Sequence, residues 1–380
     1  MLKFGIDRIE EFKDLFGDRV AFVTAPGART VDYRSPIEKL KNFCDLRLLL
    51  GPEHGVRGDK AEAVYFNDEV DIESGLPTAS LYSKKSKRID PKLFDSFDCL
   101  VYDIQDVGCR YYTFISTLKY LCEDCSAAGK HLIVLDRPNP LGGRCFGTIT
   151  EPGMENFVAC YSIPVQYGLT PGEFALMIYE EEKLEGDMHV IPCHGLTREM
   201  MFPDWKRSWV MTSPGIPTFE TVLLYPGTCL LEGTNISEGR GTSAPFSILG
   251  APFIQGEKLS EAFNQLGLPG VIATPIWFTP SVSKFKGENC GGIHIHVTDP
   301  TALRAFDMGI RLLDLLRTLY PETFEYLAPY AHDSSPHISN LMGNHAFESD
   351  WDADSLIRKG YEESAVFQNR AEPYRLYQAG

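Results

Sequence analysis

The sequence predicts an α/β fold that begins with a parallel sheet. Over the first 135 residues, short apolar segments of strand length alternate with amphipathic segments of helix length, as they do in strands joined by crossover helices. Each apolar segment ends in a turn rich in glycine, proline and polar residues. The chain has 380 residues, of which 43% are apolar, so it can bury a large core, and its length favours two domains over one. We expect these domains over residues 1–145 and 146–380.

The elements of the first domain follow from this pattern in order. A helix over residues 6–16 carries its apolar residues on one face, and a buried strand follows at 19–23. Ser35 and Pro36 supply the cap and the first turn of the next helix. The remaining elements expected in this domain are strands at 46–50, 80–82, 99–104 and 131–135 and helices at 91–97 and 113–128.

A crossover over residues 144–169 should lead into the second domain. Thr170, Pro171 and Glu173 form the cap, first turn and capping box of a helix that should end near residue 184. The stretch 205–253 is rich in proline, glycine and threonine, and we expect a long functional loop there. The other elements expected are strands at 189–192, near 271 and at 292–297 and helices at 257–266 and 302–319.

Four polar turns follow the strands of the first domain, at residues 24–29, 51–58, 105–112 and 136–143. The carboxyl ends of parallel strands lie at one edge of a sheet, and open α/β sheets bind their ligands there. We therefore expect the four turns to share one rim. No GxGxxG sequence follows the first strand, so this Rossmann-like sheet does not imply a dinucleotide, and we expect no cofactor.

The strongest candidate for chemistry is the turn over residues 51–58, which reads Gly-Pro-Glu-His-Gly-Val-Arg-Gly. It places Glu53, His54 and Arg57 within five residues, and its glycines and Pro52 favour one rigid shape. A polar surface loop would carry the same residue types, so the turn alone does not decide. Together with a second carboxylate, Glu53 could cleave a glycosidic bond by protonating the leaving oxygen. The candidates for the second carboxylate are Asp103, Asp106, Glu232 and Glu238, of which Glu238 is the strongest because it is flanked by glycine beside Arg240.

Arginines and aromatic residues on these turns are typical of a site for an anionic sugar. Arginine binds carboxylates through two parallel hydrogen bonds, and flat aromatic faces can stack on sugar rings. Both residue types are also common without such a role, on the surface and in the core respectively. The arginines in question are Arg57, Arg110, Arg137 and Arg240, and the aromatic residues are Tyr111, Tyr112, Trp209 and Tyr225.

Two alternatives come from other classes of protein. His294 and His296 lie on one face of an expected strand, and with a rim aspartate they could hold the ion of a metal-dependent hydrolase. No acidic partner motif such as HExxH accompanies them, so we expect no metal site. A second alternative is a non-catalytic amino-sugar-binding protein with the same cleft. The CxxC pair Cys122 and Cys125 has no second pair to complete a zinc site, and we expect free, mostly buried thiols.

Charge and hydropathy exclude several classes of partner. The formal net charge of −16 argues against nucleic acid and anionic membrane surfaces. No apolar run of about 18 residues occurs, and the N-terminal residues do not form a signal peptide. We therefore expect a small-molecule partner and a cytoplasmic location, or an exported one if a leader was removed. The sequence does not indicate an oligomeric state.

Four motifs taken together resemble the exo-β-N-acetylmuramidase family, the NamZ-like glycoside hydrolases that were formerly a domain of unknown function. The motifs begin at Gly51, Asp103, Leu135 and Tyr225 and read GPEHGVRG, DIQDVGCRYYT, LDRPNPLGG and YPGTCLLEGTNISEGRG. The resemblance covers most of the chain, with the motifs in one order. It implies a Rossmann-like N-terminal domain, a smaller α/β C-terminal domain and a cleft between them. In that cleft, N-acetylmuramic acid would be released from the non-reducing end of peptidoglycan fragments.

The resemblance also implies roles for individual residues. Glu53 is expected to be the catalytic acid with His54 beside it, and we add Glu238 as the further catalytic carboxylate. The residues expected to bind the substrate are Arg57, Asp103, Gln105, Asp106, Arg110, Tyr111, Tyr112, Asp136, Arg137, Asn139, Glu232, Asn235, Arg240, Thr242 and His296. Ala25 and Gly215 stand where the family usually has asparagine, so contacts to the substrate should differ at these two positions.

Overall fold

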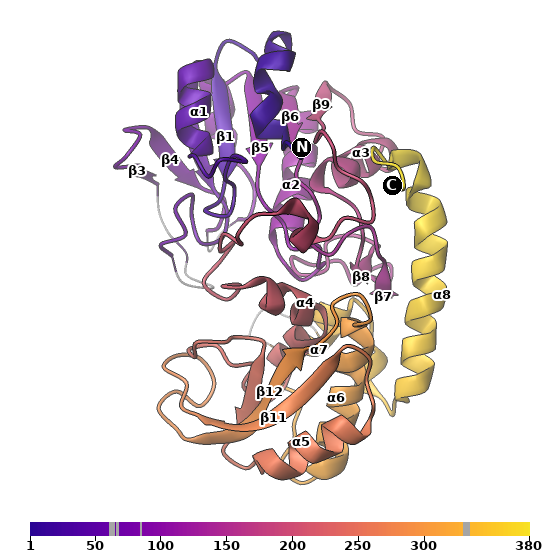
Figure 1. Ribbon diagram of the computed structural model, residues 1–380. Helices are drawn as coiled ribbons and strands as arrows, with labels where there is room; N and C mark the ends of the chain where they lie inside the picture. The colour runs from indigo at the N-terminus through magenta and orange to yellow at the C-terminus, as the bar shows by residue number, and fades with distance from the viewer. Residues whose placement is uncertain (61–64, 66–67, 84–85, 330–334) are drawn as a thin grey trace.

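The computed structural model describes residues 1–60, 65, 68–83, 86–329 and 335–380. Its largest element is a seven-stranded sheet in the order β3-β4-β2-β1-β5-β6-β9, which occupies the upper half of Figure 1. The strands are β1 (Val20–Thr24), β2 (Leu46–Gly51), β3 (Glu69–Val70), β4 (Pro77–Ser80), β5 (Cys99–Asp103), β6 (His131–Leu135) and β9 (Met188–Ile191). The helices of this half are α1 (Pro36–Phe43), α2 (Phe114–Ala128) and α3 (Pro171–Glu181), with the 3₁₀ helices η1 (Gly5–Leu15), η2 (Pro91–Ser96) and η3 (Phe202–Trp205).

The direction of the strands confirms the predicted α/β class. All neighbouring strands in this sheet run parallel except β3 and β4. The turns after β1, β2, β5 and β6 therefore begin at the same edge of the sheet, as predicted. The sheet continues past residue 145, the expected end of the first domain, because β9 pairs with β6.

The central strands are apolar along their whole length because both faces of the sheet are covered. In β1, Ala21 and Val23 pack into one apolar cluster, while Val20 and Phe22 pack into a second cluster, since successive side chains point to opposite faces. The first cluster extends into the second half of the chain through residues such as Leu249. A continuous core thus joins the two halves.

The second half is built around a three-stranded antiparallel sheet in the order β10-β12-β11, which lies in the lower part of Figure 1. Its elements are β10 (Ile248–Ala251), β11 (Val271–Phe278), β12 (Cys290–Val297), α4 (Phe219–Thr228), α5 (Gly256–Gln265), α6 (Ala305–Leu319), α7 (His337–Met342) and α8 (Ala353–Ala371), with the 3₁₀ helices η4 (Cys229–Gly233), η5 (Ala346–Glu348) and η6 (Glu372–Tyr374). The predicted crossover contains a hairpin of β7 (Phe146–Ile149) and β8 (Pro164–Gln166). Helix α8 packs against β7 and α6 and so runs beside both halves.

The prediction of one long loop over residues 205–253 is wrong, because α4, η4 and β10 lie within it. Pro226 and Gly227 are the misleading signals, since both residues usually end helices. Pro226 lies inside α4. Gly227 is a packing position, where a Cβ would lie 2.1 Å from the carbonyl oxygen of Ala305 in α6. Glycine therefore lets two helices approach closely here.

The first expected helix also differs from the prediction. Residues 5–15 form a 3₁₀ helix that is broken at Phe12, whose φ and ψ are −126° and 29°. The one-sided apolar pattern is nevertheless used, because Ile6 and Ile9 are buried against the large sheet.

All ten cysteines are free thiols, and each except Cys44 is buried, as predicted. Cys122 and Cys125 lie on α2 and face the core. Burial raises the pKa of Cys125 well above its usual value, which keeps the thiol protonated and unreactive. Within the ranges that the structure describes, no helix offers the run of apolar residues that crossing a bilayer would require.

Candidate active site

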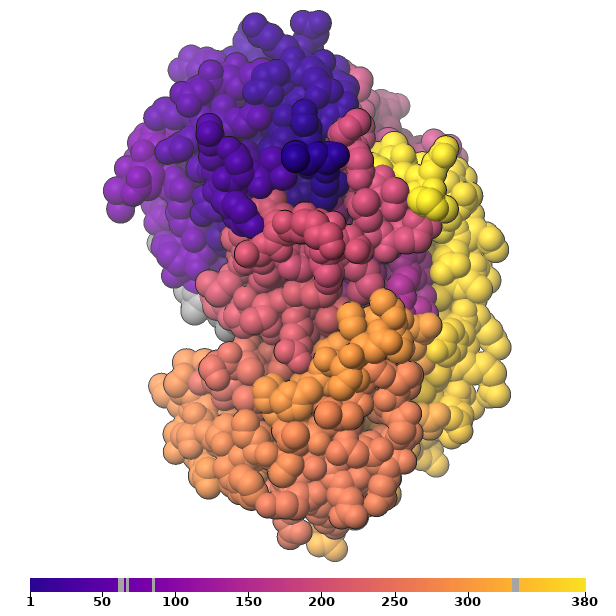
Figure 2. Space-filling view, viewed as in Figure 1, coloured from indigo at the N-terminus to yellow at the C-terminus, as the bar shows by residue number. Residues whose placement is uncertain are grey.

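A cleft of about 630 Å³ lies at the carboxyl edge of the large sheet, and both halves of the chain line it. The outline of the molecule narrows between these halves in Figure 2, where the first half is indigo to purple and the second is orange. The cleft brings together eight of the predicted site residues, namely Glu53, His54, Tyr111, Tyr112, Tyr225, Glu232, Glu238 and Arg240. We call Glu53, His54, Tyr82, Thr113 and Phe157 the first wall, and Glu232, Glu238, Arg240, Lys284 and His337 the second wall.

The first wall is positioned by the turn after β2. His54 adopts a φ of 71°, a conformation that residues with a Cβ rarely take. Gly58 is needed because its φ is 75° and because a Cβ there would lie 2.6 Å from the Pro26 ring. The turn after β2 thus packs directly on the turn after β1. This contact fixes the place of Glu53 relative to the sheet.

His54 is buried beside the cleft, with 5% of its surface exposed. Its Nδ1 atom lies 3.1 Å from the carbonyl oxygen of Lys60. Because a carbonyl only accepts hydrogen bonds, Nδ1 carries the proton of the neutral ring and Nε2 is left as an acceptor. The turn backbone therefore sets the tautomer of His54.

Hydroxyl groups hold the carboxylate of Glu53. The Thr113 hydroxyl donates a hydrogen bond of 2.8 Å to Glu53 Oε2. Thr113 is the N-cap residue of α2, but its side chain makes no capping hydrogen bond. The phenol of Tyr82 is a second partner of Glu53, and burial together with this carboxylate raises the pKa of Tyr82 well above its usual value. Both partners are hydroxyl groups, which can donate or accept a hydrogen bond.

Lys87 lies behind the first wall in a cage of aromatic rings. Its Nζ atom is 3.1 Å from the centroid of the Tyr82 ring, 4.5 Å from that of Tyr65 and 5.5 Å from that of Phe157. This atom is buried and has no hydrogen-bond partner in the described part of the chain. Burial lowers the pKa of Lys87 to about 8, although the nearby Glu53 carboxylate opposes the shift.

Ion pairs hold the carboxylates of the second wall. Arg240 contacts Glu232 Oε1 at 2.6 Å and Glu238 Oε1 at 3.3 Å. Lys284 Nζ donates to Glu238 Oε2 at 2.9 Å and to the carbonyl oxygens of Leu231 and Ile236, each at 2.8 Å. His337 Nε2 lies 3.7 Å from Glu232 Oε2. These five side chains form one connected network of charges.

The network fixes the charge of Glu232. Burial alone would raise the pKa of Glu232, but Arg240 and His337 more than offset this effect and lower the pKa to about 2. Glu232 is therefore ionised at neutral pH.

Gly239 lets the backbone beside Glu238 and Arg240 lie close to β10. Its φ is 79°, and a Cβ there would lie 2.3 Å from the Ile248 carbonyl oxygen.

Aromatic rings form the floor of the cleft. Tyr112 contacts Tyr225 edge to face with ring centroids 6.0 Å apart, and Tyr225 contacts Phe246 in the same way at 4.7 Å. The Tyr112 hydroxyl donates to Thr212 Oγ1 at 2.8 Å. Trp209 does not line the cleft, contrary to our prediction. It packs on aromatic residues of the core, and its indole N–H donates to the Ile216 carbonyl.

The structure places two predicted arginines inside the protein instead of at the rim. Arg110 is fully buried and donates to the carbonyl oxygens of Thr148, Ile163, Leu341 and Met342 at 2.7–2.9 Å. It ties the β7–β8 hairpin to α7. Arg137 is buried in an ion pair with Asp103, and burial raises the pKa of Asp103 while Arg137 opposes the shift. The expectation that these residues face the ligand is corrected by their burial.

Asp106 and Asp136 are likewise buried. Asp106 accepts hydrogen bonds from the Tyr167 hydroxyl and the Gly108 N–H, and burial raises its pKa to about 6. Asp136 accepts from the Tyr377 hydroxyl at 2.5 Å, and burial raises its pKa to about 7. The C-terminal segment thus contacts the body of the protein at Tyr377.

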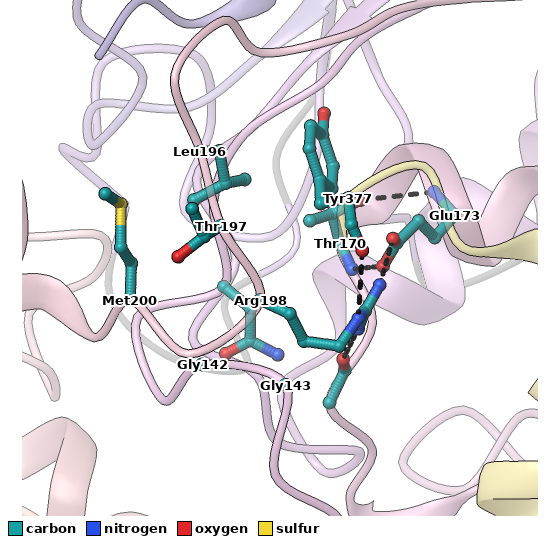
Figure 3. A pocket seen from close by; sticks show the side chains of 11 residues that line it. Gly142, Gly143, Thr170, Glu173, Leu196, Thr197, Arg198, Met200 and Tyr377 are labelled. Atoms are coloured by element: carbon teal, nitrogen blue, oxygen red, sulfur yellow. Dashed lines mark hydrogen bonds and ion pairs between the residues drawn. The ribbon is translucent and has the colours of Figure 1, made fainter. Parts of the chain in front are cut away.

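The turn over residues 136–143 faces this C-terminal segment as well as the sheet. Figure 3 shows Gly142 and Gly143 beside Arg198, Glu173 and Tyr377 around a cavity of only about 10 Å³. Arg198 contacts Glu173 and donates to the Gly168 carbonyl at 3.0 Å. This cavity is too small for a sugar, so its polar groups serve to anchor the chain end.

The remaining predicted substrate-binding residues also lie outside the cleft lining. Arg57 forms two hydrogen bonds to Asp71 at 2.7 and 2.8 Å, and Thr242 donates to the Gly239 carbonyl at 2.6 Å. Their partners are within the protein in each case. The others are Gln105, Asn139, Asn235 and His296. Gln105 donates to the carbonyl oxygens of Asp106 and Pro138, Asn139 to that of Leu169, and Asn235 to that of Thr323.

His294 and His296 do not form a metal centre with other residues of the described ranges. Their rings are 4.1 Å apart, and His296 Nε2 lies 2.9 Å from the Thr274 hydroxyl. No third histidine, cysteine or carboxylate among the described residues lies close enough to complete a set of three ligands there.

Sequence reasoning missed several residues in the cleft and behind its first wall. Thr113 ends one of the quoted motifs, so it could have been considered as a site residue. Lys284 lies in a loop and His337 is the first residue of α7, and neither belongs to a motif that would give a local signal. Lys87 lies in the lysine-rich segment 84–88, which has the composition of a solvated surface.

Comparison with known proteins gives the family. Residues 20–220 match the N-terminal part of the exo-beta-N-acetylmuramidase NamZ, and residues 223–377 match its C-terminal part. The chain is 40% identical to the peptidoglycan beta-N-acetylmuramidase NamZ of Bacillus subtilis (strain 168), over 98% of this chain and 91% of that protein. Two crystal structures of DUF1343 family proteins from Bacteroides fragilis NCTC 9343 are similar to this chain. The first is 34% identical, with a TM-score of 0.88 and 99% of both chains covered. The second is 27% identical, with a TM-score of 0.74 and 100% of both chains covered. The chain therefore belongs to the exo-β-N-acetylmuramidase NamZ family.

Proposed function

We propose that this protein is a metal-independent glycoside hydrolase that releases N-acetylmuramic acid from the non-reducing end of peptidoglycan fragments. The observation that carries the proposal is that Glu53 shares one cleft with Glu232 and Glu238, on the opposite wall. Glycoside hydrolysis needs two carboxylic groups with different tasks. The volume of about 630 Å³ is within the range of small-molecule sites, about 300–1,000 Å³, and suits the terminal unit of a glycan.

Glu53 is the residue we assign to general acid catalysis. A general acid must exist in both protonation states during one catalytic cycle. The hydroxyls of Thr113 and Tyr82 support this cycle, because a hydroxyl can donate to the carboxylate and accept from the carboxylic acid. The rigid turn holds the proton at a fixed place in the cleft. His54, with Nε2 available as an acceptor, is suited to bind a hydroxyl of the sugar or a water molecule.

A carboxylate of the second wall takes the other task. It stabilises or attacks the sugar, or it activates water, and each of these roles requires an ionised group. Glu232 is ionised at neutral pH, as its pKa of about 2 shows. Glu238 is bound by Arg240 and Lys284 in the same network. We keep Glu238 as the second catalytic carboxylate and assign Glu232 to holding Arg240.

Arg240 and Lys284 are the groups we assign to recognition of the lactyl carboxylate, which distinguishes N-acetylmuramic acid from N-acetylglucosamine. A chain with a net charge of −16 repels an anion at long range, so attraction has to come from cations inside the cleft. Both side chains are mostly buried, with 18% and 20% of their surfaces exposed. Screening by water is therefore weaker than at the protein surface.

The test compares a chromogenic β-N-acetylmuramide with the matching β-N-acetylglucosaminide. We expect kcat/KM to favour the muramide by about 10²-fold or more, because only a sugar with the lactyl carboxylate can add charge-assisted hydrogen bonds to these mostly buried cations. Arg240→Ala and Lys284→Ala should each reduce this preference. Arg311→Ala is the matched control, since Arg311 pairs with Asp354 outside the cleft. Equal rates on the two sugars would refute muramic acid recognition, and the absence of turnover on both would favour a non-catalytic sugar-binding protein.

Such an enzyme would serve the turnover and recycling of cell-wall fragments. An exo-acting hydrolase needs only the end of a short glycan, so a small muropeptide or a disaccharide is a sufficient substrate. Incubation with a defined disaccharide and with intact wall should show release of N-acetylmuramic acid from the disaccharide at the higher rate. A faster release from intact wall would point to wall degradation instead.

A further inference from the structure

A second group of chemically active side chains lies at the other end of the large sheet. His131 begins β6, Asp187 directly precedes β9, and His189 is the second residue of β9. The parallel register pairs Leu132 with Met188 and Ile133 with His189, which places Asp187 beside His131. The turn at 136–143 leaves the opposite end of β6. A strand of five residues spans about 16 Å, so this group is well separated from the rim.

The three side chains converge. One ligand atom from each residue lies within 4.8 Å of the other two. Asp187 Oδ1 is 3.1 Å from His189 Nε2, and Asp187 Oδ2 is 3.9 Å from His131 Nε2. Ligand atoms around a tetrahedral zinc ion are about 3.5 Å apart. A small movement of Asp187 would reach that spacing, and its side chain is 70% exposed and therefore able to move.

One ring nitrogen of His131 lacks a hydrogen-bond partner within the described ranges. Its Nε2 atom is buried and has no hydrogen-bond partner in the part of the chain that the structure describes. Buried polar atoms of side chains are usually paired. The rings of His131 and His189 stand nearly perpendicular, at 80°, with centroids 5.3 Å apart. Two imidazoles and one carboxylate are the ligand set of many zinc sites, with water in the remaining position.

We propose that His131, Asp187 and His189 bind one Zn²⁺ ion, which clamps the edge strand β9 to β6. The ion would be structural, because the carboxyl edge that carries the cleft is at the far end of these strands. β9 is the strand that closes this side of the sheet. A metal bridge would stabilise it without taking part in hydrolysis. Because His131 and His189 are 58 residues apart, no local motif in the sequence indicates the site.

The experiment is a zinc titration of the full chain after removal of metal by a chelator. Calorimetry at neutral pH should show about one zinc ion per chain with micromolar affinity. His131→Ala and His189→Ala should each weaken zinc binding by at least about 10-fold. Loss of a residue that only orients a metal ligand already lowers metal affinity by about this factor, and these variants remove a ligand itself. The matched control is the double variant His294→Ala/His296→Ala, which removes the other close histidine pair and should bind zinc as the unmodified chain does.

Asp187→Asn provides a second variant that should fold normally, because its side chain is mostly exposed. It should also weaken zinc binding. Zinc should raise the melting temperature of the unmodified chain and of the control but not of the three site variants. The proposal would be overturned by the absence of zinc binding in the micromolar range, or by binding that the site variants retain. Hydrolysis that depends on zinc would overturn the structural role. The binding and melting measurements do not require turnover, so they are independent of the proposed function.

Discussion

The two walls of the cleft hold the same kind of side chain in different ways. On the first wall, Glu53 receives hydrogen bonds from hydroxyls, and aromatic rings surround its partners. On the second wall, Glu232 and Glu238 are bound by Arg240 and Lys284. Partners that can donate or accept allow a carboxyl group to gain and lose a proton, whereas fixed cations favour a permanent negative charge. The environment of a glutamate therefore indicates its task better than its presence in a motif.

The largest effect should come from Glu53→Gln. Glutamine keeps the size of glutamate and its contacts to Thr113, but it cannot transfer a proton. We expect kcat on the natural disaccharide to fall by about 10²-fold or more with an unchanged melting temperature. Steady-state kinetics and a thermal unfolding curve on the same preparation measure both quantities. Near-normal turnover would remove Glu53 from the role of acid.

Glu238→Gln should lower both activity and stability, in contrast to Glu53→Gln. It leaves Arg240 and Lys284 with less negative charge nearby, and Glu238 is buried, with 2% of its side chain exposed. Weakening the charge-assisted contacts of these mostly buried cations should cost about 1–3 kcal/mol. Urea denaturation should show this loss in the free energy of unfolding together with a lower kcat. A stable variant with normal kcat would show that Glu238 has neither role.

Thr113→Val tests the support of the acid with a nearly isosteric change. Valine removes the hydrogen bond of 2.8 Å to Glu53, and a hydrogen bond of this kind contributes about 0.5–1.5 kcal/mol. We expect kcat to fall by about 2–10-fold and the pH profile of kcat to shift, since the free energies of the two protonation states of Glu53 change. An altered KM with an unchanged pH profile would instead indicate a role in substrate binding.

Lys87→Met should give the smallest effect, a pH-dependent difference in stability. The pKa of Lys87 is lowered from 10.5 in the unfolded chain to about 8 in the folded protein. Between these values the unfolded chain binds more protons at this residue, so the free energy of unfolding rises with pH in this window. The methionine variant lacks this rise. Its stability relative to the unmodified chain should be greatest below pH 8 and should decline toward pH 10.5. A constant difference would contradict the burial of a charged Lys87.

The sequence could predict the parallel sheet, the shared rim and the turn that carries Glu53 into the cleft, because these depend on local patterns. Alternating apolar segments and the turn after β2 are visible in a few consecutive residues. The sequence could not separate Arg240, which lines the cleft, from Arg110, which binds carbonyl groups in the core. Both lie in glycine-containing motifs, and only the tertiary fold decides which side of a turn faces solvent. Lys284 reaches Glu238 from 46 residues away, so no spacing reveals it.

The most direct test that the two walls have different tasks is how the activity of wall variants depends on the leaving group of the substrate. The measurement compares kcat/KM of Glu53→Gln and Arg240→Ala on the natural disaccharide and on an aryl muramide with a good leaving group. An activated leaving group needs little protonation, so Glu53→Gln should lose at least about 10-fold less activity on the aryl substrate than on the disaccharide. Arg240→Ala should lose the same factor on both, since its proposed role is to bind the lactyl group, which both substrates carry. Equal losses of Glu53→Gln on the two substrates would contradict the assignment of Glu53 as the acid.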